Sequence, residues 1–131
     1  MIDYESTIFN SVHPVAAPLC AKDRFVSKPL VDYAKLPAAG LYEMDNTTLR
    51  LRQSSTPGEN FAVITYQLDV AAATKAKCRS IYAAIDAKMI SLNFNRISGQ
   101  FITYPDNPDL VRYVARYESV VDVNGNLYRR L

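Results

Sequence analysis

The chain has 131 residues with a formal net charge of +2, and 49% of its residues are hydrophobic and 21% charged. These values predict one globular domain, residues 1–131, whose core needs no cross-links, and so small a charge does not imply nucleic-acid binding. No apolar run reaches the roughly 18–20 residues of a membrane span, and the acidic start, Met1 to Glu5, is unlike a secretory signal.

The N-terminal residues predict an amphipathic helix over residues 3–13. Tyr4, Ile8 and Val12 recur at helical spacing. Pro14 lacks an N–H and clashes with the preceding turn, so we expect the helix to end near His13. A short turn is then expected to finish by residue 23.

The residue types that follow predict two short strands, at residues 24–27 and 41–44. Residues 28–37 between them contain two prolines and predict a surface connection. Residues 47–59 predict an extended arm or loop, because alternating residues are followed at once by turn residues. This arm has only two leucines to bury, so its alternating residues are candidate contacts with a neighbouring subunit: Leu49, Arg50, Leu51 and Arg52.

The second half of the chain predicts longer elements. A strand is expected over residues 61–70, and Thr74 can cap a helix over residues 75–92. Residues at i, i+3, i+4 spacing give that helix its core-facing stripe: Cys78, Ile81, Tyr82, Ile85, Met89 and Leu92. A further strand over residues 94–104 is expected to bend near Gly99.

The stretch from residue 110 to residue 121 predicts the central strand of the sheet. Tyr113 and Tyr117 belong to the alternate set that faces the core, while Arg112, Arg116 and Glu118 belong to the outward set. These three charged residues are therefore candidate contacts with another subunit or partner, and the alternative is a solvated face whose ion pairs contribute little. The Asn124-Gly125 pair predicts a tight turn, after which residues 127–131 either return as a short edge strand or remain loose.

Together these elements predict an α+β fold, in which a mostly antiparallel sheet carries two helices packed on one face.

The sequence predicts no catalytic, cofactor or metal site. His13, Cys20 and Cys78 do not form a recognised metal-ligand pattern, and the two cysteines are expected to be buried thiols. Asp106 and Asp109 occupy a proline-flanked turn, where Asp is favoured for local hydrogen bonds. Tyr and Arg of the 110–121 strand point to opposite faces, which argues against a base-stacking surface.

Three stretches give the chain a resemblance to a known family: Met1 to Ser6, Glu59 to Val70 and Arg112 to Tyr117. With the helix after Thr74, they resemble the small neck proteins of long-tailed bacteriophages, described as tail terminator, tail completion or minor capsid proteins. The resemblance implies a ring, commonly a hexamer, that ends the tail tube and meets the head-side connector. It also implies DNA passing through the bore, a place in the neck of the virion and assembly in the host cytoplasm. Pro14 and Pro18 depart from the continuous first helix of that family.

Three alternatives remain open at this stage. The first is a head-completion or adaptor protein one layer higher in the neck. The second is a small enzyme, which a polar pocket holding His13, Asp106 or Asp109 would favour. The third is a nucleic-acid-binding module that uses Lys75, Lys77, Arg79 and Arg96.

Overall fold

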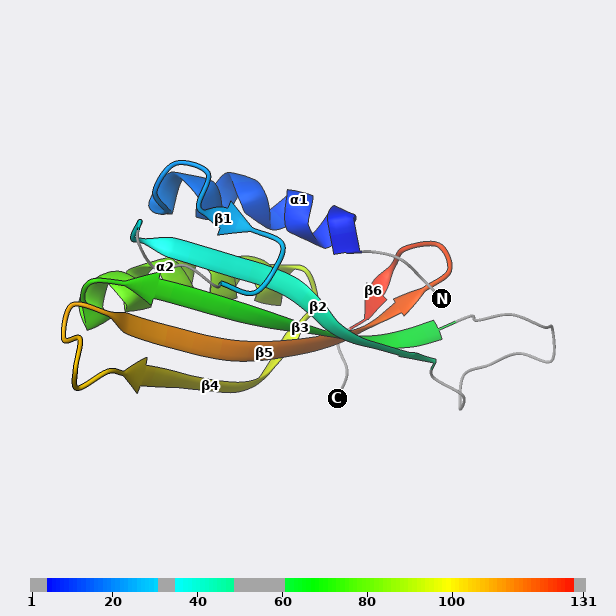
Figure 1. Cartoon of the computed structure of the whole chain (residues 1–131). Helices are drawn as coiled ribbons and strands as arrows, with labels where there is room; N and C mark the ends of the chain where they lie inside the picture. The colour runs from blue at the N-terminus through cyan, green and yellow to red at the C-terminus, as the bar shows by residue number, and fades with distance from the viewer. Residues whose placement is uncertain (1–4, 31–34, 49–60, 129–131) are drawn as a thin grey trace.

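The computed structural model describes residues 5–30, 35–48 and 61–128. Within these ranges the elements follow the order α1 (Glu5–Ala16), a 3-10 turn η1 (Ala17–Leu19), β1 (Phe25–Val26), β2 (Ala38–Thr48) and β3 (Phe61–Ala72). They continue with α2 (Lys75–Ser91), β4 (Asn95–Thr103), β5 (Val111–Asp122) and β6 (Leu127–Tyr128). The predicted α+β class is confirmed, with two helices and one mostly antiparallel sheet (Figure 1).

The strands lie in the order β1-β2-β3-β5-β4, and β6 adds to the end of β5. The centre of the sheet is the antiparallel pair β3–β5, which stays in register from Phe61 opposite Asp122 to Ala72 opposite Val111. All pairs are antiparallel except the short β1–β2 pair. The expectation that the sheet is built around the strand at residues 110–121 is therefore confirmed.

Both helices pack on the same face of the sheet. Ile8 and Val12 of α1 join one core with the stripe of α2 and with alternate residues of β3 and β5 (Figure 1). Full burial of each large apolar side chain in such a core contributes about 1.5–3 kcal/mol. The predicted core stripe of α2 is confirmed, with four members fully buried and Tyr82 and Leu92 packed at the margin. The Thr74 side chain accepts a hydrogen bond from the N–H of Lys77, as predicted for the cap.

The prediction that the first helix ends at His13 is wrong. Helix α1 continues through Pro14 to Ala16. Proline removes one hydrogen bond, but here only two helical residues follow it, and Ala16 is fully buried against the core. Pro18 lies at the start of η1, where a missing N–H is easily tolerated.

Strand β2 is much longer than the predicted four residues. It covers Ala38–Thr48 and bulges between Glu43 and Asp45. Residues 47 and 48 therefore belong to this strand and not to an arm. The rest of the predicted arm, with Leu49, Arg50, Leu51 and Arg52, lies outside the described residues.

Strand β4 is irregular at Ile97, between Arg96 and Ser98, and not at Gly99. Gly99 instead permits a close approach, because a Cβ there would overlap the hydroxyl of Tyr113. The predicted turn at Asn124-Gly125 is confirmed by the β5–β6 hairpin, in which Gly125 has a φ of 81°.

Candidate assembly surface on the open face of the sheet

The described residues cover only part of the face of the sheet that lies opposite the two helices. At one end Leu30 and Leu110 form a small second core with Ala38 and Ala71. Gly40 allows this cover, since a Cβ there would lie 2.5 Å from the backbone oxygen of Lys28. Beyond this end, no helix among the described residues covers the face, and we call this region the open face.

The predicted contact residues Arg112, Arg116 and Glu118 share the open face. They alternate along β5 with Tyr113 and Tyr117, which point into the helix-covered core. The face assignment made from the period-two pattern is therefore confirmed. The exposure of the three residues differs, however: Arg116 is exposed, whereas Arg112 and Glu118 are half-buried.

Arg112 belongs to a partly buried polar network. One of its terminal nitrogens lies 3.9 Å from Oδ1 of Asp69, whose side chain is only 3% exposed. The other donates a hydrogen bond of 3.0 Å to the hydroxyl of Tyr104. Asp69 also accepts a hydrogen bond of 3.1 Å from the amide of Gln67. Arg112 thus supplies the opposite charge to a buried carboxylate, which gives it a structural role.

Arg116 lies beside this network, but its side chain is exposed to water. Its Nε donates a hydrogen bond of 3.4 Å to the side-chain oxygen of Gln67. So long and exposed a bond contributes little to stability, because water competes for both groups. Arg116 can therefore change partners on assembly more easily than Arg112.

The tyrosines on the covered face cannot form a surface for stacking on bases. The ring centroid of Tyr113 lies 4.0 Å from that of Tyr82 and 4.8 Å from that of Phe101. The hydroxyl of Tyr117 donates a 2.6 Å hydrogen bond to Asp86, and burial, followed by this bond, raises the pKa of Tyr117. The prediction that Arg and Tyr of β5 serve opposite faces is confirmed.

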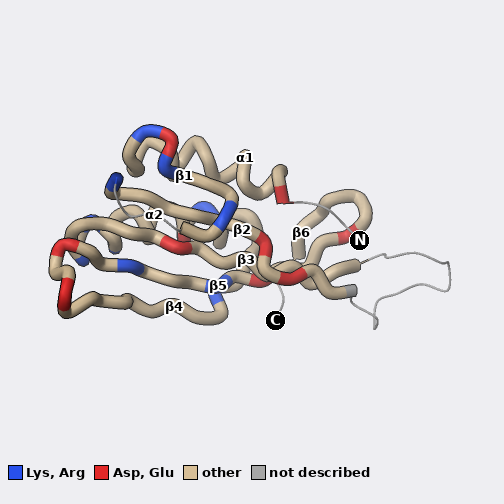
Figure 2. The backbone as a smooth tube through the Cα atoms, viewed as in Figure 1, with Lys and Arg blue, Asp and Glu red and all other residues tan. Residues whose placement is uncertain are grey.

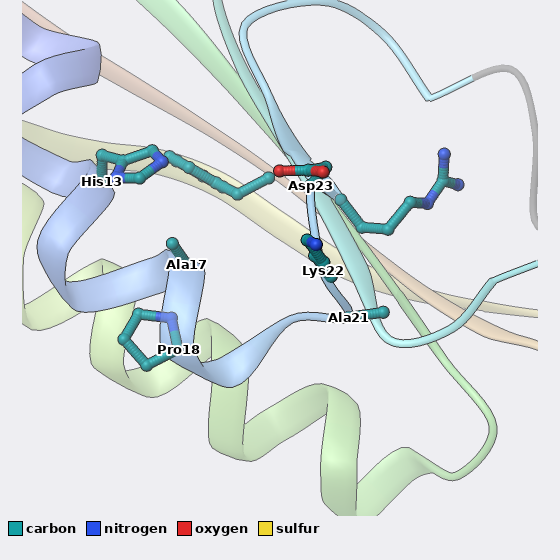
Figure 3. Close-up of a pocket in the computed structure, with 8 residues that line it drawn as sticks. His13, Ala17, Pro18, Ala21, Lys22 and Asp23 are labelled. Carbon is teal, nitrogen blue, oxygen red and sulfur yellow. The ribbon is translucent and has the colours of Figure 1, made fainter.

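A second feature is a surface hollow of about 480 Å³ between the end of α1 and β1. Figure 3 shows His13, Ala17 and Pro18 on its helical side and Lys22 and Asp23 on the connection to β1. His13 and Asp23 are both exposed to water. This lining provides an exposed imidazole and an exposed carboxylate, but not the buried base and activated nucleophile typical of enzymes.

The other residues considered for chemistry are dispersed. Asp106 and Asp109 lie exposed in the turn between β4 and β5, away from the hollow. Cys20 and Cys78 are unpaired with each other, and burial raises the pKa of each thiol to about 11. Both thiols are therefore protonated near neutral pH and are poor nucleophiles. Among the residues that the structure describes, no group of His, Cys, Asp and Glu could hold a metal ion.

Two polar residues that the sequence pattern did not single out have structural importance. Asp69 is buried on the open face, and Asp122 is buried at the β5–β6 hairpin. Alternation along β3 places Asp69 on the open face, where it lies opposite Gly40. The connection after β1 passes over Gly40, since the backbone oxygen of Lys28 lies there. The Asn124-Gly125 turn signal was the available hint for Asp122, since Asp often bonds to nearby backbone N–H groups.

The chain matches no protein-family model, and a comparison with curated proteins finds no match either. Across the described ranges, neither helix has the length and apolar character needed to cross a membrane.

Proposed function

We propose that this chain is a structural protein of the neck of a long-tailed phage. In this role it forms a ring of identical subunits that ends the tail tube and joins it to the head-side connector, with DNA passing through the bore. It acts as an assembly part and not as an enzyme, and it requires no cofactor. The proposal combines the resemblance of three stretches of sequence with the form of the open face.

The open face of the sheet gives the main structural support for this proposal. Antiparallel sheets can leave one face in water, but such faces are then mostly polar. Here Val63 and Val114 lie half-buried among Thr65, Gln67 and Arg116. A mixed surface on a rigid sheet, with an exposed arginine beside apolar side chains, is typical of protein contact regions. This supports association of the subunit with copies of itself or with neighbouring neck proteins.

The surface charge adds support for head-to-tail association. Residues 1–49 hold four Lys/Arg and six Asp/Glu, whereas residues 50–131 hold eleven and seven. Figure 2 shows both signs of charge along the backbone of the fold. A cyclic ring joins two different patches of each subunit, so an uneven charge distribution is compatible with it. The alternative within the same class is an adaptor one layer higher in the neck. A density map of the neck would distinguish the adaptor position from the end of the tail tube.

The test is the mass of the protein in solution, alone and with purified tail tube protein. We expect ring-sized species, or capping of the tubes, for the native chain. Arg116→Glu should weaken this assembly at least tenfold in midpoint concentration while the fold is retained. Lys22→Glu, exposed on the other side of the molecule, is the matched control and should assemble normally. A native chain that stays monomeric and never joins tubes or connectors would refute the proposal.

A further inference from the structure

Three cations lie over aromatic rings on the helix-covered side of the sheet, opposite the open face. Lys75 and Arg79 project from α2, and Arg96 projects from β4; all three are exposed. We call these three residues the basic ridge. Its acidic neighbour Asp86 already accepts the hydrogen bond of Tyr117 and lies 3.8 Å from Arg96. The ridge therefore keeps an excess of positive charge.

Aromatic rings hold these cations in place. The Lys75 Nζ lies 4.8 Å from the ring centroid of Phe101, and the guanidinium of Arg79 lies 5.6 Å from the same centroid. The guanidinium of Arg96 lies 5.6 Å from the ring centroid of Tyr82. Contacts between cations and aromatic faces are favourable. They also restrict these long side chains before binding, so that less conformational entropy is lost when a ligand binds.

The same arrangement places like charges together. Lys75 and Arg79 are four residues apart on one face of α2 and share one ring. Like charges at this spacing repel each other, and cations near the start of a helix are also unfavourable. An anion bound over the ridge would relieve both effects.

The chemistry of the ridge favours a phosphate backbone over an acidic protein. Lysine is depleted from the cores of protein interfaces, which are centred on apolar and aromatic anchors. Here the aromatic ring of Phe101 lies beneath two cations and is not offered to a partner. Each strand of duplex DNA carries one charge about every 3.4 Å of helix axis, and residues four apart on a helix have Cβ atoms about 5–6 Å apart, so long side chains at such positions can reach different phosphates.

We propose that the basic ridge contacts the phosphate backbone of double-stranded DNA without reading its sequence. The inference deepens the proposed function, on which it rests, because it assigns the surface that faces the DNA in the bore. The ridge and Arg116 lie on opposite sides of the sheet, so DNA contact and assembly can be altered separately.

Fluorescence anisotropy with two labelled duplexes of unrelated sequence tests this inference on the full chain. We expect equal binding to both duplexes, with an affinity that falls with salt at a log–log slope of roughly −0.9 for each phosphate contacted. The double variant Lys75→Glu/Arg79→Glu should bind at least tenfold more weakly at low salt, with a slope shallower by about 2. Glu suits the first turn of a helix, where Lys75 lies, and Arg79 is exposed, so this variant should remain folded, which circular dichroism would check.

The control is Lys22→Glu/Lys28→Glu, which changes the net charge equally at exposed positions near β1. It should lose less than threefold in affinity. Equal losses in the two double variants, no binding by the native chain at low salt, or tighter binding to polyglutamate than to DNA would each overturn the inference. Solution mass, measured on the same samples, separates the two proposals. A native chain that assembles without binding DNA refutes only the ridge, whereas a monomer that binds DNA through the ridge refutes only the ring.

Discussion

Arg112 and Arg116 lie four residues apart on the same strand and face, yet their surroundings differ. Arg112 faces the buried Asp69, and its side chain is 19% exposed. Arg116 faces water and the amide of Gln67. The loss of Arg112 therefore affects the fold, and only the loss of Arg116 reports on assembly.

Arg112→Glu should therefore destabilise the subunit by about 3–5 kcal/mol, because it leaves a buried carboxylate facing another carboxylate. Arg116→Glu should change the free energy of unfolding by no more than about 0.5 kcal/mol. Urea unfolding followed by circular dichroism measures both values. If the two variants lose equal stability, the Asp69–Arg112 pair does not have the structural role inferred from its burial.

Gly99 offers a second test at the scale of one residue. Tyr113 is held between Tyr82 and Phe101, so its ring cannot easily swing away from a new Cβ. Gly99→Ala should destabilise the fold by about 1–3 kcal/mol through overpacking. Tyr113→Phe removes the hydroxyl that the Cβ would overlap, and should recover part of this loss in the double variant. Additive losses in a double-mutant cycle of thermal unfolding would show that the clash is relieved elsewhere.

At the scale of elements, the β5–β6 hairpin depends on one carboxylate. Oδ1 of Asp122 accepts hydrogen bonds of 2.9 Å from the N–H groups of Asn124 and Asn126. Its other oxygen accepts hydrogen bonds from the Asn126 side chain and from the Tyr128 hydroxyl, at 3.2 and 2.9 Å. The backbone bond from Asn126, followed by the side-chain bond from Tyr128, lowers the pKa of Asp122 below its usual value of 3.8.

A lowered pKa means that the folded state favours the charged carboxylate. Its contribution to stability is present at a pH above 3.8 and is lost as the pH falls below 3.8 through the folded-state pKa. We expect Asp122→Asn to melt at a lower temperature than the native chain at pH 7, with a difference that shrinks as the pH approaches 2. Melting curves from pH 2 to pH 7 measure this. A difference that is independent of pH would show that the charge of Asp122 is not responsible.

The elements that the sequence predicted well are those whose own pattern determines them. Helix α2 was expected over residues 75–92 and covers Lys75–Ser91, because its cap and its apolar stripe are local features. Strand β2 was underestimated, since Asp45 and Asn46 are poor strand formers that are held there by pairing with β3. Helix α1 passes Pro14 because tertiary packing of Ala16 outweighs a local penalty.

At the scale of the whole molecule, the sequence predicted which residues share the open face but not how deeply each is buried. Alternation along β5 is enough to separate Arg112 and Arg116 from the tyrosines. Asp69 lies opposite Gly40, and the connection that crosses Gly40 is far from Asp69 in the chain. The basic ridge likewise requires β4 to bring Phe101 beneath Lys75 and Arg79. Local periodicity carries no information on such contacts between elements that are distant in the chain.

A substitution at the centre of the open face tests whether the assembled protein uses this surface. Thr65 lies directly opposite Asp45 on β2 and Glu118 on β5. Thr65→Lys places a cation between two carboxylates, so the subunit should keep its stability or gain about 0.2–1 kcal/mol for each pair. The same long side chain would stand above a flat contact surface and hold a partner away. We therefore expect a stable monomer with assembly weakened at least tenfold, measured by solution mass over a concentration series.

Thr103→Lys is the matched control, since Thr103 is exposed at the end of β4 and gains the same charge away from the centre of the open face. It should assemble as the native chain does. If Thr65→Lys folds and still assembles normally, the open face meets only water in the oligomer, and the subunit contacts must lie at the edges of the sheet. If Thr65→Lys unfolds, the two carboxylates do not accept the new cation, and the register of β2, β3 and β5 at this position is contradicted.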